Sequence, residues 1–385
     1  MHMTTKNEYM REQLPHYLKA DKQAKANILN DICRICGYRR KYATWKLGDM
    51  QKKPPVEREG RQRRRRKKTY GPECIPPLKY IWEFLEFPCG ERMQPYLPTI
   101  IPLLERHGNL SILPVVRDKL LAMSIATVDR LLEKQRHVRR RKAQSTTRAG
   151  TLLKNQIPVR HELWPEDTVP GYEEMDFVAH CGEKNAGDYV ATLSTIDIAT
   201  TWIEHAAILG RSKQRTVVAL ENMEKRLPFT LKGIDPDNDG QFINYFLYDW
   251  CQAHTPPVEF TRSRAYRKND NAHIEQKNWS HVRRVFGYQR LDTEKQWRLM
   301  EELYQGPLHD WQNFFQPTLK IKEKERRGSR VIKRHDEAKT PYQRVLDNPH
   351  VPDEKKEALR AYYKTLNPVT VKREVDRLIK EIFKP

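Results

Sequence analysis

The sequence has few cysteines, and their arrangement excludes a disulfide framework. Its six cysteines are scattered over 385 residues, which is typical of reduced thiols in an intracellular protein. Cys33 and Cys36 have the spacing of metal ligands, but no second Cys pair or nearby His pair completes a tetrahedral zinc site. Two buried cysteines on a helix are the simpler interpretation.

Long apolar runs are also absent. No segment approaches the roughly 18 consecutive apolar residues of a transmembrane helix, and the first residues do not have the pattern of a secretory signal peptide. We therefore expect a soluble cytoplasmic protein without a membrane partner. The hydrophobic share of 38% still permits packed cores, and the length predicts two to four domains.

Acidic residues are in short supply relative to basic ones. The chain has 71 Lys and Arg against 50 Asp and Glu, a formal net charge of +21. Such an excess favours a polyanionic partner, because every phosphate that a cation neutralises releases condensed counterions. The composition therefore indicates nucleic acid.

Residues 1–50 form the first predicted helical module. Residues 25–36 carry apolar side chains on one side, Gly37 ends this helix, and a basic helix follows. This pattern is typical of a helix-turn-helix, whose second helix enters the major groove. A plain helical hairpin with a solvated basic face fits this segment equally well. The candidate DNA contacts are Arg39, Arg40, Lys41 and Thr44.

Residues 72–137 form a second predicted helix-turn-helix module. Ser124 is a candidate N-cap, after which Ile125, Val128, Leu131 and Leu132 are expected to pack while Ala126 faces outward. Small residues at the start of a helix followed by arginine suit a close approach to base edges and phosphates. The candidate DNA contacts here are Thr127 and Arg130.

Two basic linkers separate these modules from each other and from the rest of the chain. Residues 51–71 and 138–168 are rich in arginine and lysine. The like charges within each linker repel one another, so the linkers are expected to stay extended unless phosphates neutralise those charges. A solvated linker is the alternative to a DNA-tracking arm. The candidate DNA contacts in the linkers are Arg63, Arg64, Arg65, Arg66, Arg139 and Arg140.

Residues 169–290 change to an α/β pattern. Strands are predicted at 174–180, 189–196, 200–208, 230–234 and 258–261, with helices at 212–226 and 242–253. A helix over 266–288 follows, with Ile274, Val282, Val285 and Phe286 on its apolar side and Gly287 at its end. The segment therefore predicts one mixed five-stranded sheet with helices.

The C-terminal region, 291–385, is predicted to be basic and largely helical. Helix is expected to about residue 313, and two closing helices over 346–385. Residues 314–345 carry alternating basic residues, which fit either a small β element or an ordered basic arm.

Three carboxylates stand where this α/β pattern would bring them together. Asp176 lies inside an apolar strand, where a carboxylate needs a cation or a strong hydrogen-bond partner. Asp237 lies in an acidic turn between a strand and a helix, and Glu275 borders the apolar side of the last helix. Hard divalent cations require such oxygen ligands, and a pair of them can activate an attacking oxygen and stabilise a leaving one.

These residues carry a family resemblance. Asp176, the run Asp-Asn-Asp-Gly-Gln-Phe-Ile-Asn at 237–244 and the run Asn-Ala-His-Ile-Glu-Gln-Lys-Asn-Trp at 271–279 together resemble the DDE catalytic core of retroviral integrases and bacterial insertion-sequence transposases. The helical modules, the linkers and Ala-Lys-Thr-Pro-Tyr-Gln-Arg at 338–344 look like one bacterial branch of those transposases.

The resemblance implies an RNase H-like core in which Asp176, Asp237 and Glu275 hold two Mg²⁺ or Mn²⁺ ions. It also implies that water nicks the DNA end of a mobile element and that the freed 3′-hydroxyl attacks target DNA in line. The implied partner is double-stranded DNA, both element ends and target. Pairing two ends implies a homo-oligomer on DNA, and the implied location is the bacterial nucleoid.

The second acid has two candidates. In the family this acid usually begins Asp-Asn-Gly, whereas here Asp237-Asn is followed by Asp239-Gly. The gap to Glu275 holds 37 residues from Asp237 (275 − 237 − 1) and 35 from Asp239 (275 − 239 − 1), and 35 is the family's familiar spacing. We favour Asp237, because Phe242-Ile-Asn244 then follows at the family's distance and two extra residues near 253–257 are tolerated in a loop.

Several polar residues surround the predicted site. His180, His205 and His273 are expected to be structural histidines, and Asp188, Asp197 and Asp235 to be turn residues. Basic and amide side chains in and before the last helix are candidates for contacts with the DNA backbone. These candidates are Arg264, Arg267, Lys268, Lys277, Asn278 and Arg283.

Two other functions remain open from the sequence. A DNA-binding regulator derived from a transposase would not require three acids in register, and an RNase H-like nuclease for RNA–DNA hybrids would not require two helix-turn-helix modules.

Overall fold

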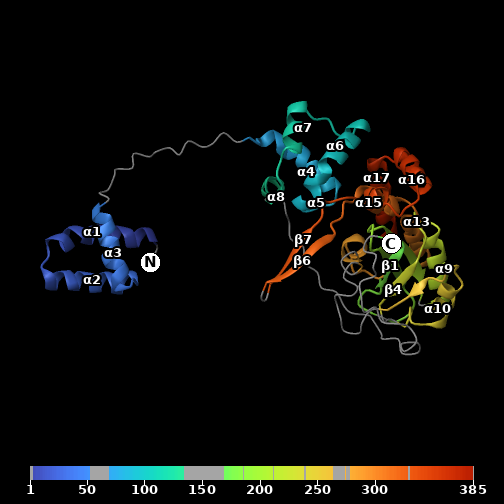
Figure 1. Ribbon diagram of the computed structural model, residues 1–385, viewed down its shortest axis with the longest axis horizontal. Helices are drawn as coiled ribbons and strands as arrows, with labels where there is room; N and C mark the ends of the chain where they lie inside the picture. The colour runs from blue at the N-terminus through green and yellow to red at the C-terminus, as the bar shows by residue number, and fades with distance from the viewer. Residues whose placement is uncertain are drawn as a thin grey trace. The chain divides into compact units, whose positions relative to one another are not determined.

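The structure is a computed structural model of the 385-residue chain (Figure 1). It describes residues 3–52, 69–133, 169–184, 186–210, 212–237, 240–262, 274, 278–327 and 330–384. The chain divides into two compact units, Met1–Lys68 and Thr69–Pro385. The two predicted linkers lie largely outside the described residues.

Three helices make up the first unit: α1 (Met3–Lys19), α2 (Lys22–Cys36) and α3 (Arg40–Lys52). Asp21 begins α2 by accepting a hydrogen bond from the backbone N–H of Ala24. Gly37 ends α2 as predicted, with φ 68, a left-handed conformation that glycine adopts without steric cost. Met10, Ile32 and Leu47 are buried between the helices and belong to a small core of this unit's own residues.

The second unit begins with short helices that contain several prolines. They are η1 (Pro72–Cys74), α4 (Ile75–Phe84), α5 (Gly90–Met93), η2 (Gln94–Tyr96), α6 (Leu97–Arg106), α7 (Pro114–Leu121) and α8 (Ile125–Leu132). Ser124 caps α8 as predicted, accepting from the backbone N–H of Thr127. The prediction that Ile125 packs is wrong: its side chain is 39% exposed, because the fully buried side of α8 is that of Val128 and Leu132.

A mixed five-stranded sheet follows, as predicted. Its strands are β1 (Tyr172–Ala179), β2 (Val190–Asp197), β3 (Ile203–Leu209), β4 (Gly233–Pro236) and β5 (Glu259–Phe260), in the order β3-β2-β1-β4-β5. β2 pairs antiparallel with both β1 and β3, whereas β4 pairs in parallel with β1 and β5 in parallel with β4. The helices α9 (Lys213–Glu224) and α10 (Tyr245–Gln252) connect the parallel part. β1 is therefore the central strand.

The rest of the second unit is helical apart from one hairpin. Its helices are η4 (Asn278–Arg283), α12 (Arg284–Phe286), α13 (Glu294–Gln305), α14 (Pro307–Asp310), η5 (Trp311–Phe315), α15 (Pro341–Asp347), α16 (Asp353–Thr365) and α17 (Pro368–Ile382). The hairpin consists of β6 (Ile321–Arg327) and β7 (Arg330–His335), which form a separate two-stranded sheet. Of the two interpretations of 314–345, the β element is therefore the one found.

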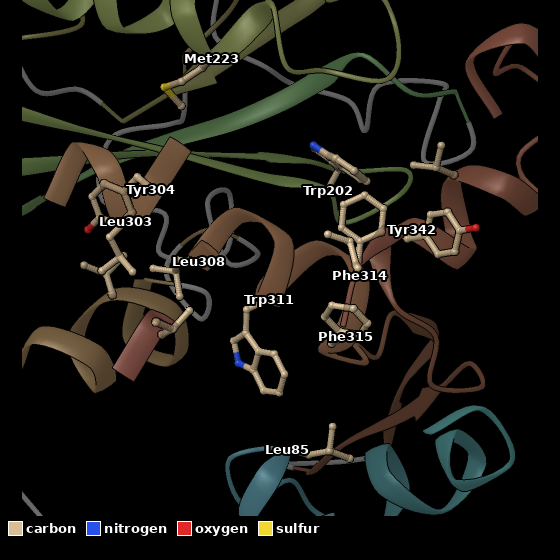
Figure 2. Packing of buried hydrophobic residues seen from close by; sticks show 14 of the residues in the cluster. Leu85, Trp202, Met223, Leu303, Tyr304, Leu308, Trp311, Phe314, Phe315 and Tyr342 are labelled. Atoms are coloured by element: carbon tan, nitrogen blue, oxygen red, sulfur yellow. The ribbon is translucent and has the colours of Figure 1, made fainter. Parts of the chain in front are cut away.

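Aromatic side chains join the sheet to the helices around it (Figure 2). Trp202 at the start of β3 packs against Phe314, whose ring in turn contacts Tyr342, with centroids 5.6 and 5.1 Å apart. Phe84 of α4 lies edge-on to Trp311, at 5.1 Å between centroids. The helices α4–α8 and the sheet thus share one hydrophobic core.

Among the helices that the structure describes, none combines the length and the apolar composition needed to cross a bilayer.

Candidate functional site

Asp176 lies on the central strand, and its carboxylate is oriented by two hydrogen bonds. Its Oδ1 accepts from the backbone N–H of Phe177 at 2.7 Å, and its Oδ2 accepts from Nδ2 of Asn278 at 2.6 Å. The side chain is half-buried. Carboxylate oxygens are also ligands for hard divalent cations.

Asp237 follows β4 directly, and the strand register decides which β1 residue it faces. β4 pairs in parallel with β1 from Tyr172–Gly233 to Met175–Pro236. Continuing this register by one residue pairs Asp176 with Asp237, on neighbouring strands about 4.8 Å apart. Asp237 is also half-buried. Asp239, the other candidate, lies outside the described residues.

A second pair of carboxyl groups lies two residues earlier on the same two strands. Glu174 and Asp235 are register partners on β1 and β4, and both are buried. Asp235 accepts a hydrogen bond from Oγ1 of Thr261 at 2.9 Å, and Glu174 accepts one from the backbone N–H of Ile274 at 3.0 Å. Asp235 was expected in a turn but lies in a strand. The apolar residues just before Asp235 were the sequence signal that the strand could extend to it. Its register partner, Glu174, is known only from the pairing of β4 with β1.

The segment that carries the third predicted acid contacts β1 on both sides of that acid in the sequence. Glu275 itself lies outside the described residues, but Ile274 bonds Glu174 and Asn278 bonds Asp176. Ile274, Val282 and Phe286 are buried as predicted, and the segment ends at Gly287 as predicted. Within the described part it is not a regular α-helix, because Asn278–Arg283 is π-helical. Such wide turns occur often at functional sites.

Two residues predicted to contact DNA, Asn278 and Arg283, differ in their burial. Asn278 is only 6% exposed, and its Oδ1 has no hydrogen-bond partner among the described residues. Arg283 is half-buried, with its guanidinium 5.0 Å from the ring centroid of Tyr288. Burial lowers the pKa of Arg283, while nearby groups that include Asp176 oppose this shift.

The described histidines near the sheet have structural surroundings, as expected. His180 is fully buried and shares a hydrogen bond with Thr192 at 2.8 Å, and burial lowers its pKa to about 3. His205 shares one with Ser194 at 2.9 Å, and burial lowers its pKa to about 4. Both are therefore neutral near pH 7. His273 lies outside the described residues.

The predicted DNA contacts of the first unit are exposed at the start of α3. Arg40 is hydrogen-bonded to Asn30, and the hydroxyl of Thr44 bonds the carbonyl of Arg40 at 3.0 Å; Arg39 and Lys41 are also exposed. Next to them lies a row of aromatic rings that was not predicted to have a role. Tyr38, Tyr42 and Trp45 contact one another along α3, and Trp45 is 61% exposed. Their helical spacing was the available signal.

In the second unit, the predicted contacts lie on α8. Arg130 is exposed and bonds Oγ1 of Thr127 at 3.4 Å. The remaining predicted DNA contacts lie outside the described residues. They are Arg63, Arg64, Arg65, Arg66, Arg139, Arg140, Arg264, Arg267, Lys268 and Lys277.

Metal binding can be judged only in part from the described residues. Within them, no group of three or more His, Cys, Asp or Glu side chains could hold a metal ion. The oxygens of Asp176 and Asp237, together with the buried Oδ1 of Asn278, are nevertheless the hard donors that Mg²⁺ and Mn²⁺ prefer. The donor chemistry on β1 and β4 therefore fits a divalent cation.

Comparison with known proteins gives one extensive sequence match. The chain is 38% identical over 333 residues to the uncharacterized protein y4rM of Sinorhizobium fredii, covering 86% of this chain and 93% of that protein. No family model matches. A solved structure that resembles the chain is the catalytic core domain of BIV integrase, at 16% identity and a TM-score of 0.31, covering 47% of this chain and 96% of that one.

Proposed function

We propose that this chain, which belongs to the same family as the uncharacterized protein y4rM of Sinorhizobium fredii, is a metal-dependent polynucleotidyl transferase that acts on DNA. In the finer form of the proposal it is a transposase or integrase. It binds the ends of a mobile element, hydrolyses a phosphodiester to free a 3′-hydroxyl, and joins this hydroxyl to target DNA. The catalytic acids are Asp176, Asp237 and Glu275.

The observation that supports this proposal most directly is the parallel register of β1 and β4. Its last pair is Met175–Pro236, so Asp176 and Asp237 are the next residues on the two strands, at the point where β4 ends. Two ionised carboxylates at neighbouring positions repel each other, and a shared cation removes that repulsion. The same register favours Asp237 over Asp239 as the second acid.

Support for Glu275 comes from its neighbours in the sequence. Ile274 and Asn278 each donate a hydrogen bond to a carboxylate of β1, so the chain is held against the central strand on both sides of Glu275. Glu275 lies between these two residues in the sequence and is our choice for the third ligand.

The roles of the chain's own residues follow from these contacts. Two Mg²⁺ or Mn²⁺ ions, when bound, would activate the attacking oxygen and stabilise the leaving one. Asn278 holds the carboxylate of Asp176 in one orientation, and Glu174 accepts the backbone N–H that precedes Glu275. The net charge of +21 supplies attraction for the polyanionic substrate.

Strand transfer of a labelled element end into a plasmid tests the proposal. With Mg²⁺ present, Asp176→Asn, Asp237→Asn and Glu275→Gln should each reduce joining by at least about 100-fold, because each removes a charged metal ligand. Asp239→Asn should keep most of the activity, and so should the control Asp188→Asn, which removes an exposed acid elsewhere.

Other results would require a different function. Joining that survives Asp176→Asn would contradict the proposed site. Joining that is lost with Asp239→Asn and kept with Asp237→Asn would move the second acid. Cleavage of RNA–DNA hybrids without DNA joining would indicate a nuclease, and tight DNA binding by a protein that never cleaves DNA would indicate a regulator.

A further inference from the structure

The hairpin of β6 and β7 is an isolated two-stranded ribbon (Figure 1). Every side chain described in it is exposed except that of His335, which is half-buried. A two-stranded ribbon with neither face covered is marginally stable in water by itself. Its stability must therefore come from its attachment to the rest of the second unit, and its exposed faces are available for binding.

The stem of the ribbon is attached firmly. The carboxylate of Asp336 accepts from the backbone N–H of Lys320 at 2.8 Å and from the guanidinium of Arg344 at 2.5 Å. Arg344 also donates to the carbonyl of Thr318 at 2.9 Å, and its side chain is only 9% exposed. Lys320 reaches back to the carbonyl of Ala199, beside the turn between β2 and β3. These contacts link the ribbon to the sheet through a half-buried, charge-assisted cluster.

The two faces of the ribbon differ in charge. Directly opposite residues share a face, so one face carries Glu323 with Arg334, Glu325 with Ile332, and Arg327 with Arg330. Acids offset cations on this mixed face, where Glu323 pairs with Arg334 at 3.3 Å and Glu325 with Arg327 at 2.8 Å. The other face, here called the cationic face, carries Lys324 with Lys333 and Arg326 with Val331, and no acid.

No acid is among the residues paired on the cationic face. Within the described part of the chain, Lys333 has neither an ion pair nor a hydrogen bond. A polyanion lying on this face would supply a counter-charge for Lys333.

We propose that the cationic face of the β6–β7 ribbon binds the phosphates of duplex DNA across a groove. The major groove admits a two-stranded ribbon, and seven residues of strand extend roughly 24 Å, enough to reach phosphates on both sides. The described residues of the ribbon include no Asn or Gln, the side chains that read adenine, and we assign its arginines and lysines to phosphates, which a protein can contact whatever the base sequence. The inference rests on the proposed function in that DNA is the substrate.

Two matched double variants of the full-length protein test this inference. Arg326→Gln with Lys333→Gln removes two positive charges from the cationic face, and Arg327→Gln with Arg334→Gln removes two from the mixed face. Binding to short fluorescent duplexes of two unrelated sequences is measured by anisotropy between about 50 and 200 mM salt. Unfolding curves establish that both variants are folded.

The cationic-face variant should lose at least about tenfold in affinity for both duplexes. Its slope of log affinity against log salt should become shallower by about 0.9 for each phosphate that is no longer neutralised, or about 1.8 for two phosphates. The mixed-face variant should change the slope by less than half as much. Equal losses in the two variants, or no loss in either, would overturn the inference. So would a defect confined to one duplex sequence.

Further measurements separate this inference from the proposed function and from other occupants. The same comparison is repeated in Asp176→Asn protein, so that binding is measured where joining is blocked. A face-specific defect there supports the ribbon even if strand transfer is never observed. Normal strand transfer with no face-specific loss of binding would contradict the DNA-binding role of the ribbon and leave the proposed function standing. Face-specific loss of binding to single-stranded DNA or polyglutamate, without loss for duplex DNA, would also overturn it.

Discussion

At the scale of single residues, buried polar side chains bond to the half-buried Asp176 and to the backbone of Ile274. Asp176 is oriented by Asn278, and Glu174 holds the backbone just before Glu275. Hydrogen bonds to a charged group are stronger than those between neutral groups. The residues behind the carboxylates should therefore matter nearly as much as the carboxylates.

Substitution of Asn278 tests this reasoning. Asn278→Ala removes a hydrogen bond to a carboxylate, a loss of about 1.5 to 3 kcal/mol, and should slow strand transfer by about 10- to 100-fold. Asn278→Asp adds a like charge beside Asp176, so the pair should hold a proton more tightly and the acid limb of the pH–rate profile should move to higher pH. The control is Asn222→Ala, which truncates an exposed asparagine on α9.

Equal slowing by the two Asn278 variants with an unchanged pH profile would mean that Asn278 only supports the fold.

At the scale of elements, two glycines with positive φ differ in what surrounds them. Gly37 ends α2 with φ 68, and an added Cβ there would meet no atom within 4 Å. Gly171 precedes β1 with φ 109, and its Cβ would lie 2.2 Å from the backbone carbonyl of Thr230. The first position requires only the left-handed conformation, whereas the second also requires the absence of a side chain.

The two alanine variants should therefore differ in stability. Gly37→Ala should cost about 1 kcal/mol in the unfolding of the first unit, the usual cost of a left-handed alanine. Gly171→Ala should cost more than about 3 kcal/mol in the second unit, because a backbone atom must move. Urea unfolding followed by circular dichroism measures both. A smaller loss for Gly171→Ala than for Gly37→Ala would contradict the close approach of Thr230.

At the scale of the whole molecule, buried titratable groups in the second unit set the pH dependence of stability. Burial lowers the pKa of His180 to about 3 and of His205 to about 4, so the unfolded chain binds more protons below about pH 6.5. Burial raises the pKa of Glu173 to about 8. Burial alone would lower the pKa of His309, but Glu204 and Asp310 outweigh it and raise the pKa to about 9.

The signs of these shifts predict a maximum of stability near about pH 6.5. Below it, stability falls because His180 and His205 gain protons only on unfolding, and together they outweigh the opposite effect of Glu173, which keeps its proton in the folded state from about pH 4.5 to about 8. Above it, stability falls because the folded chain keeps protons on Glu173 and His309 that the unfolded chain has lost. Each group contributes at most about 1.4 kcal/mol per pH unit. Urea midpoints from about pH 4 to 9 test this.

Glu173→Gln should flatten the fall in stability between about pH 6.5 and 8, and it should steepen the acid side above about pH 4.5, because the unfolded Glu173 carboxyl already loses its proton there. A profile of the variant that still falls equally steeply above about pH 7 would exclude Glu173 as a cause.

Much of the architecture was determined by the sequence alone. Gly37 and Ser124 mark helix ends through their own backbone and side-chain chemistry, and the strands and helices of the sheet follow from apolar periodicity over adjacent residues. Such signals are local, so they are present before the chain folds. The same is true of the three acids, whose residue types and spacing are sequence properties.

Only the tertiary structure decided which of these residues meet. The hydrogen-bonded ladder between β1 and β4 ends at Met175–Pro236, one residue before Asp176 and Asp237, and a shift of one residue would change every partner. Asn278, expected at the DNA surface, was turned inward by packing against β1. The charge on each face of the β6–β7 ribbon likewise depends on pairing across the turn. These outcomes depend on contacts between distant residues, which periodicity and local propensity do not encode.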